Sequence, residues 1–173
     1  MAITRIGPNQ SINLASNITG TLPTGNGGTG ATSFAPGKVL QTVQTNDVTE
    51  RTTTSTSFVT ASNSLSINIT PSSSSNKVFI FVSLAAGNNT SGQHVYTTFY
   101  RNSTNMGTAN GFVTTYQGGT GEHYGGATMG QLDSPNTTSQ ITYQIRIKAQ
   151  SGSTFYINEY QSTSSITLFE IGA

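Results

Sequence analysis

Ile141-Thr-Tyr-Gln-Ile-Arg-Ile-Lys148 is the stretch that decides the fold class, because its odd-numbered positions are apolar and its even-numbered positions are polar. Successive side chains of a β-strand point to opposite faces, so this alternation is typical of an antiparallel strand with one face buried and the other in solvent. Ser64-Leu-Ser-Ile-Asn-Ile69 alternates in the same way, with Leu65, Ile67 and Ile69 on one face. Neither stretch has the spacing of an amphipathic helix.

Similar patterns recur on both sides of these two stretches, separated by turn signals such as Pro71–Asn76 and Gln150–Ser153. The further predicted strands are Val39–Val43, Val78–Leu84, His94–Arg101, Gly111–Tyr116, Thr154–Tyr160 and Ile166–Ile171. The sequence shows no repeat of the length expected for a propeller blade. Eight to ten short strands therefore predict an all-β fold, an antiparallel β-sandwich of the jelly-roll type.

The predicted strand Val78–Leu84 is apolar on both faces, unlike the alternating strands. Val78, Ile80 and Val82 share one face, and Phe79 and Phe81 share the other. A sandwich core covers only one face of a sheet, so we expect a neighbouring subunit to cover the second. Phe79 and Phe81 are accordingly the predicted interface residues of a homotrimer whose strands pack about a shared axis.

The composition of the 173 residues is neutral and polar, with 33% hydrophobic and 8% charged residues and a formal net charge of +1. A protein that binds nucleic acid needs several Lys or Arg residues for the phosphates, so a nucleic-acid partner is not expected. The chain has no cysteine, which excludes disulfides and thiolate chemistry. The N-terminus lacks the apolar run of an export signal, and Lys77–Ala86 is about half the length of a membrane-spanning helix, so no membrane span is predicted.

The composition changes near residue 37, and we expect two parts: an extended leader over residues 1–36 and the sandwich over residues 37–173. The leader is rich in Gly and Thr and has too few apolar residues for a core of its own. It should stay extended unless it docks on copies of itself or on another protein, which makes it a candidate anchor. Its apolar residues, the candidate anchor residues, are Ile12, Leu14, Ile18 and Leu22.

The sequence offers little that could carry chemistry. Gly25-Asn-Gly-Gly-Thr-Gly30 matches a dinucleotide-binding pattern, but no helix follows it to hold a pyrophosphate. Glu122-His123-Tyr124 is the nearest approach to a site, weighed against an exposed glycine-rich loop over Gly118–Gly126. We predict no catalytic residue, metal ligand or cofactor, and keep Glu122, His123 and Tyr124 as candidate ligand-loop residues. Seven aromatic residues are suited to stacking on sugars, although core or subunit contacts are the favoured interpretation: Tyr96, Phe99, Tyr100, Tyr116, Tyr124, Tyr156 and Tyr160.

Two stretches of the leader carry a family resemblance. Ile12–Pro23, which contains Ile-Thr-Gly-Thr-Leu-Pro, and Gly25–Thr32, which contains Asn-Gly-Gly-Thr-Gly, resemble the linker of bacteriophage tail-fibre proteins, especially those of marine and cyanobacterial phages. The rest of the chain looks like the terminal domain often joined to that linker, at Pro36–Gln41, Ile69–Val78 and Ile166–Ile171.

The resemblance implies a trimeric, jelly-roll-like structural protein of the virion, assembled in the host cytoplasm and not an enzyme. Its leader would be held by a tail adaptor, and its distal part would attach to a glycan or protein of the host cell surface. A short leader with one module equally suits a capsid decoration or head-fibre protein, whose leader would contact the major capsid protein.

A polysaccharide depolymerase is the remote alternative, because a glycosidase needs two carboxylates roughly 5 to 10 Å apart and the six acids are spread singly along the sequence.

Overall fold

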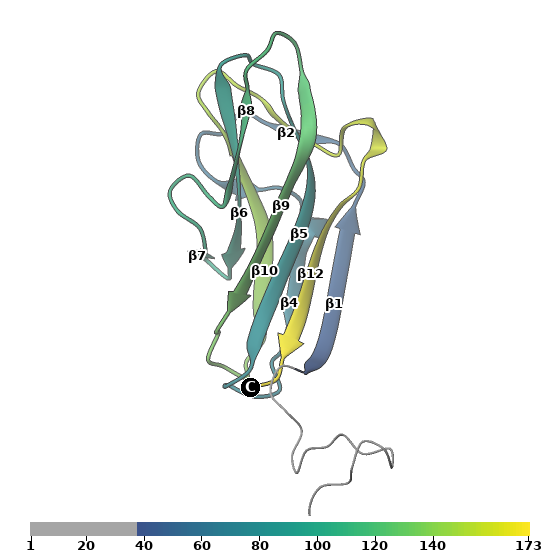
Figure 1. The fold of residues 1–173 in the computed structure, drawn as a ribbon, viewed down its shortest axis with the longest axis vertical. Helices are drawn as coiled ribbons and strands as arrows, with labels where there is room; N and C mark the ends of the chain where they lie inside the picture. The colour runs from purple at the N-terminus through teal and green to yellow at the C-terminus, as the bar shows by residue number, and fades with distance from the viewer. Residues whose placement is uncertain (1–37) are drawn as a thin grey trace, which may run out of the picture. The chain divides into compact units, whose positions relative to one another are not determined.

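A computed structural model describes residues 38–173 of the chain, which form two antiparallel β-sheets packed face to face (Figure 1). The predicted leader and its four candidate anchor residues lie outside the described residues. The first sheet, sheet A, contains β1 (Val39–Asp47), β2 (Arg51–Thr53), β5 (Lys77–Asn88), β9 (His123–Asp133), β11 (Phe155–Ile157) and β12 (Ser164–Ile171). The second, sheet B, contains β3 (Val59–Thr60), β4 (Ser66–Ile69), β6 (Gln93–Arg101), β7 (Thr104–Asn105), β8 (Val113–Gln117) and β10 (Ile141–Ala149).

The strand order confirms the jelly-roll prediction. In sheet A the hydrogen-bonded order is β1-β12-β5-β9, and in sheet B it is β4-β10-β6-β8. Strands that are far apart in the sequence thus form the antiparallel pairs β1–β12, β4–β10, β5–β9 and β6–β8. This nesting of four pairs in two four-stranded sheets is the double Greek key of a jelly roll. The shorter strands β2, β3, β7 and β11 extend the two sheets at their margins.

The core lies between the sheets and follows the alternation in the sequence. Along β10, Tyr143, Ile145 and Ile147 are buried, while the intervening polar residues are partly exposed. Along β5, Val78 and Ile80 face the same core from the opposite sheet. Complete burial of each such side chain stabilises the fold by about 1.5–3 kcal/mol, so the alternating strands supply most of the driving force for the sandwich.

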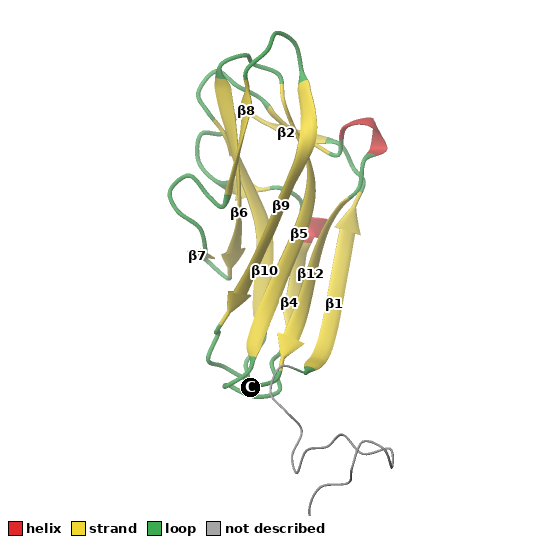
Figure 2. Ribbon diagram, viewed as in Figure 1, coloured by secondary structure: helices red, strands yellow, loops and turns green. Residues whose placement is uncertain are grey.

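Several strand boundaries differ from the prediction, and β1 and β5 run on to Asp47 and Asn88, beyond the predicted Val43 and Leu84. The predicted strand over 64–69 begins at Ser66, because Leu65 lies in the 3-10 helix η2 (Asn63–Leu65), where the Ser62 hydroxyl accepts a hydrogen bond from the Ser64 amide at 3.1 Å. The predicted strand over 154–160 ends at Ile157 and is followed by a second 3-10 helix, η3 (Glu159–Gln161). Both 3-10 helices are shown in red in Figure 2.

A further difference is β9, which has no counterpart among the predicted strands. His123 and Tyr124 were assigned to an exposed loop, but they begin this strand, which pairs with β5 over its whole length. Its apolar signal is weak because Gly125, Gly126 and Gly130 occupy exposed positions. Pairing with the strongly apolar β5 therefore compensates for a poor intrinsic strand propensity.

Polar networks join distant parts of the sandwich. Arg101 of β6 donates from Nη1 to both carboxylate oxygens of Asp133 in β9, each at 2.9 Å, and the Tyr143 hydroxyl donates to Asp133 at 2.6 Å. This network links sheet B to sheet A. At the end of β12, the buried Glu170 carboxylate accepts from the Ser72 amide and hydroxyl and from the Asn76 amide group, at 2.6–2.7 Å.

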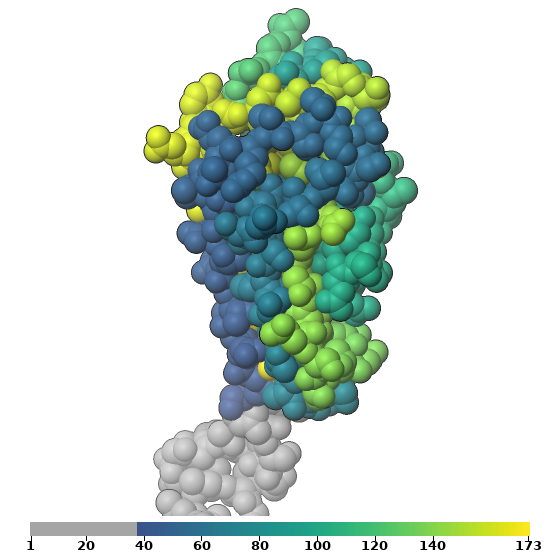
Figure 3. Space-filling model, turned by 180° about the vertical axis from the view of Figure 1, so that it is seen from behind, coloured from purple at the N-terminus to yellow at the C-terminus, as the bar shows by residue number. Residues whose placement is uncertain are grey.

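The rear face of the sandwich is covered in part by the segment that follows β1. In the view from behind, this blue segment lies across the upper part of the face, beside the yellow-green residues of β10 (Figure 3). β3 belongs to this segment and pairs with β10 through Val59 and Thr60. Among residues 38–173, no helix is long and apolar enough to cross a membrane.

Candidate functional site

The first candidate site is an apolar patch on the outer side of sheet A. The strand register places Phe169, Phe79 and Leu132 in one row across β12, β5 and β9. Phe81 follows two residues along β5, and Val39 and Ile171 form the next pair at the end of the sheet. We call these six residues the apolar face: Val39, Phe79, Phe81, Leu132, Phe169 and Ile171.

Several side chains of the apolar face are open to solvent. Val39 is 50% exposed, Phe81 41% and Leu132 47%. Phe79 is half-buried because its ring packs against Phe169, with the ring centres 6.2 Å apart. The structure thus brings Phe79 and Phe81 together on the outer side of β5, as the doubly apolar pattern predicted. Whether a neighbouring subunit covers them stays a prediction.

Uncharged residues continue the same face along the sheet beyond Phe81. Thr167 and Gly130 lie beside Phe81 on the neighbouring strands, and Ser165 and Thr128 flank Ser83 in the next row. Neutral hydroxyl groups carry a much smaller desolvation cost than charged groups. This side of sheet A can therefore be covered by another protein surface without burying an unpaired charge at these positions.

The second candidate site lies at the opposite end of β5 and consists of three tyrosines from three elements. Tyr124 comes from β9, Tyr156 from β11 and Tyr160 from η3. The register places Tyr156 and Tyr124 on either side of Gly87. The Tyr124 ring centre is 6.5 Å from that of Tyr156 and 5.2 Å from that of Tyr160, and both pairs meet edge to face, at 65° and 76°.

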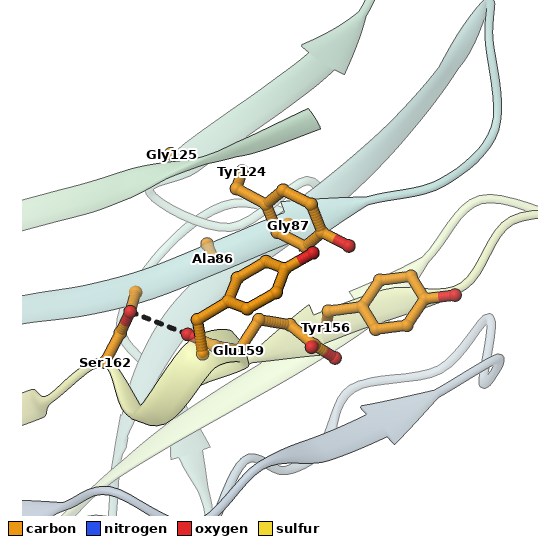
Figure 4. A pocket seen from close by; sticks show the side chains of 9 residues that line it. Ala86, Gly87, Tyr124, Gly125, Tyr156, Glu159 and Ser162 are labelled. Atoms are coloured by element: carbon orange, nitrogen blue, oxygen red, sulfur yellow. Dashed lines mark hydrogen bonds between the residues drawn. The ribbon is translucent and has the colours of Figure 1, made fainter. Parts of the chain in front are cut away.

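The tyrosines surround a small hollow, which we call the tyrosine site (Figure 4). Its floor is the backbone of Ala85, Ala86 and Gly87, and its wall includes Glu159 and Ser162. Gly87 fits closely here, because a Cβ at this position would lie 3.0 Å from the Tyr124 ring and 3.1 Å from the His123 carbonyl oxygen. The missing side chain lets the Tyr124 ring lie against β5.

The segment that carries Tyr160 has an unusual backbone. Asn158, Tyr160 and Gln161 all have left-handed conformations, with φ of 59°, 55° and 60°. Asn158 tolerates this conformation and is held by its side chain, which donates to the Thr49 carbonyl at 3.1 Å and accepts from Ser164 at 2.5 Å. A tyrosine rarely adopts it, and strain of this kind is frequent at functional sites. Tyr160 nevertheless remains 75% exposed.

Acidic side chains contribute to the tyrosine site, although the sequence spreads them singly. The Tyr124 hydroxyl donates a hydrogen bond to Glu122, and this bond is the main cause of the raised pKa of the Tyr124 phenol. Partial burial, followed by the charges of Glu50 and Glu122, raises the pKa of Glu159. The fold therefore brings the charges of Glu50 and Glu122 within electrostatic range of Glu159.

The outer side of sheet B has a different character. Arg146 lies over the Tyr100 ring at 4.3 Å, and Lys148 lies over the rings of Phe58 and Tyr96 at 4.8 and 4.7 Å. The basic side chains on this face are therefore already paired with aromatic rings of the same chain. His94 stacks near Tyr116, with the ring centres 4.8 Å apart.

Metal binding has no support among residues 38–173, where no cluster of three His, Asp or Glu side chains could hold an ion. Of the predicted ligand residues, Glu122 and Tyr124 meet at the tyrosine site, while His123 lies next to them at the exposed start of β9. Glu159 is not among the predicted site residues. A signal was present, since Asn158-Glu-Tyr-Gln161 interrupts the strand pattern between β11 and β12.

The fold and the two sites define an all-β, antiparallel jelly-roll protein with an apolar outer sheet face. No protein-family model and no curated protein sequence matches the chain. Among solved structures it is similar to that of infectious bursal disease virus, Gx strain, with a TM-score of 0.46 and 15% identity over 78% of this chain and 33% of that chain. It is also similar to the VP2 subviral particle of infectious bursal disease virus, with a TM-score of 0.40 and 14% identity over 78% of this chain and 39% of that one. The chain covers between a third and two fifths of those two chains.

Proposed function

We propose that the protein is a structural, non-enzymatic subunit of a bacteriophage particle, and specifically a trimeric tail-fibre subunit that attaches the particle to the host cell surface. The apolar face carries this proposal, because an exposed row of large apolar side chains on a folded sheet is typical of an interface between protein chains. The resemblance of Ile12–Pro23 and Gly25–Thr32 to a tail-fibre linker supports the assignment to a phage particle.

The apolar face is suited to contacts between copies of the chain. It is formed by the ends of four strands of a rigid sheet, so little conformational entropy is lost when it is covered. Three such faces can meet around a threefold axis, where each would bury its neighbours' exposed aromatic rings. In such a trimer the outer side of sheet B and the loops would stay exposed, and these surfaces would contact the host cell.

The proposal is tested on purified phage particles. A gold-labelled antibody against residues 38–173 is located by electron microscopy, and binding of the purified protein to host cells is measured separately. Label on the tail together with saturable cell binding supports the tail-fibre proposal. Label over the whole head without cell binding contradicts it and identifies a capsid decoration protein instead.

Polysaccharide cleavage is the alternative function, because the charges of Glu50 and Glu122 act on Glu159. A glycosidase would use two of Glu50, Glu122 and Glu159 as acid and base or nucleophile. The proposal predicts that the protein releases no reducing ends from host polysaccharide. Release by the wild type that is abolished in both Glu122→Gln and Glu159→Gln would contradict a non-enzymatic role.

A further inference from the structure

The tyrosine site combines three aromatic rings, a hollow open to solvent and a carboxylate. Three tyrosine rings meet edge to face around a hollow that is open to solvent and floored by the backbone at Gly87. Two of the rings remain in contact with solvent, since Tyr124 is 38% and Tyr160 75% exposed. The rings of Tyr124 and Tyr160 are therefore accessible to a ligand from solvent.

The charge of the site is negative. Glu159 lines the hollow, and Figure 4 shows its side chain extending toward Tyr156. The charges that act on Glu159 come from Glu50 and Glu122, which are both acidic. A cation in the hollow would relieve this repulsion, whereas an anion would add to it.

The faces of aromatic rings favour the same kind of ligand. The negative face of a tyrosine ring attracts ammonium groups, and several rings placed at right angles to one another form the aromatic cages that bind quaternary ammonium compounds. This chain uses the same interaction internally on sheet B, where Lys148 and Arg146 lie over aromatic rings. At the tyrosine site the residues that line the hollow include no Lys or Arg.

We propose that the tyrosine site binds an ammonium cation, with Tyr124, Tyr156 and Tyr160 as the walls of an aromatic cage and Glu159 as its counter-charge. A quaternary ammonium group such as that of choline satisfies these contacts without needing a hydrogen-bond acceptor on every side. Tyr160, whose backbone is left-handed, lines the hollow with its exposed ring. The inference concerns this site alone and does not depend on the assignment to a phage particle.

The test is a titration of the full chain with choline chloride, followed by the amide NMR signals of Gly87, Tyr124 and Ser162. The neutral isostere 3,3-dimethylbutan-1-ol, which has the same shape without the charge, is titrated in parallel, and sodium chloride controls for ionic strength. Each ring and the carboxylate contribute about a two- to fivefold gain in affinity, so the four together lower a roughly molar baseline to a dissociation constant of about 2 to 60 mM. The isostere should bind about tenfold more weakly or not at all.

Two variants assign the binding to the named groups. Glu159→Gln removes the counter-charge and Tyr160→Gly removes one wall together with the backbone strain, and each should weaken choline binding about fivefold. Tyr116→Ala, an exposed tyrosine of sheet B, is the matched control and should leave the affinity unchanged. Tyr160 is exposed, so the Tyr160→Gly protein is expected to fold.

The proposal would be overturned by any of three results. The first is that choline at about 100 mM, a concentration that would fill most of the site, shifts none of the three signals. The second is that the neutral isostere binds as tightly as choline, which would identify an apolar hollow without charge recognition. Unchanged affinity in both Glu159→Gln and Tyr160→Gly would place the binding elsewhere.

Discussion

Replacement of Phe81 by Ser should dissociate the proposed trimer, and the size of the effect follows from its exposure. A phenylalanine side chain has about 200 Å² of surface, of which the 41% exposed fraction is about 80 Å². Covering this area in an interface stabilises the assembly by about 2 kcal/mol per copy. Three copies lose about 6 kcal/mol, which lowers the trimer association constant roughly 10⁴-fold.

The assay is sedimentation equilibrium at several protein concentrations, with the mass checked by light scattering. Phe81 points away from the core, so the variant should keep the wild-type far-UV spectrum and still unfold in one cooperative transition, although dissociation of the trimer lowers its apparent melting temperature. Tyr116→Ser is the matched control, because it removes a ring that is 54% exposed on the opposite sheet. That control should remain trimeric at concentrations where Phe81→Ser is a monomer.

Two outcomes would refute this reasoning. The first is a wild-type protein that stays monomeric at all accessible concentrations, which would show that the apolar face does not associate with itself. The second is a Phe81→Ser protein with the same association constant as the wild type. In that case the subunits would meet through another surface, and the exposure of Val39 and Leu132 would need a different explanation.

Three further predictions concern stability. Tyr143→Phe removes the hydroxyl that donates to Asp133 and should lower the free energy of unfolding by about 1–3 kcal/mol, measured by urea denaturation. Glu170→Gln weakens three hydrogen bonds to a buried carboxylate and should cost a similar amount, with earlier hydrogen exchange in the turn before β5 as its local sign. Burial alone would raise the pKa of Asp47, but hydrogen bonds from Ser62, Thr49 and Arg51 outweigh it and lower the pKa to about 2. The stabilisation from Asp47, about 2 kcal/mol, is therefore complete above pH 4 and is lost as the pH falls toward 2, and Asp47→Asn should flatten this acid limb in a denaturation series.

The fold could be predicted where apolar and polar residues alternate in the sequence. β10 and β12 bury one face, and β5 is apolar on both, so the pattern alone indicated an antiparallel sandwich with one unusual strand. β9 was not predictable in this way, because its glycines carry no apolar signal and its place is set by pairing with β5. Pairing between strands that are about 45 residues apart depends on tertiary structure, which local periodicity does not contain.

The residues of the two sites could be predicted to different degrees, again because local periodicity does not fix the pairing between distant strands. Phe79 and Phe81 are neighbours on one strand, so their shared face is fixed by a period of two. Their partners Leu132 and Phe169 come from distant strands and could be assigned only from the register. Tyr160 is harder still, because its position depends on a left-handed backbone conformation that is rare for a tyrosine.

The two sites lie on the same strand but are far enough apart to act independently. Phe79 and Gly87 both face the outer side of β5, and eight residues of extended strand separate them by roughly 26 Å. An interface that covers the apolar face can therefore leave the tyrosine site open. If this is so, Phe81→Ser should abolish assembly without changing choline affinity, and Glu159→Gln should weaken choline binding without changing the mass. A variant that altered both properties would show that the tyrosine site is itself part of the contact between subunits.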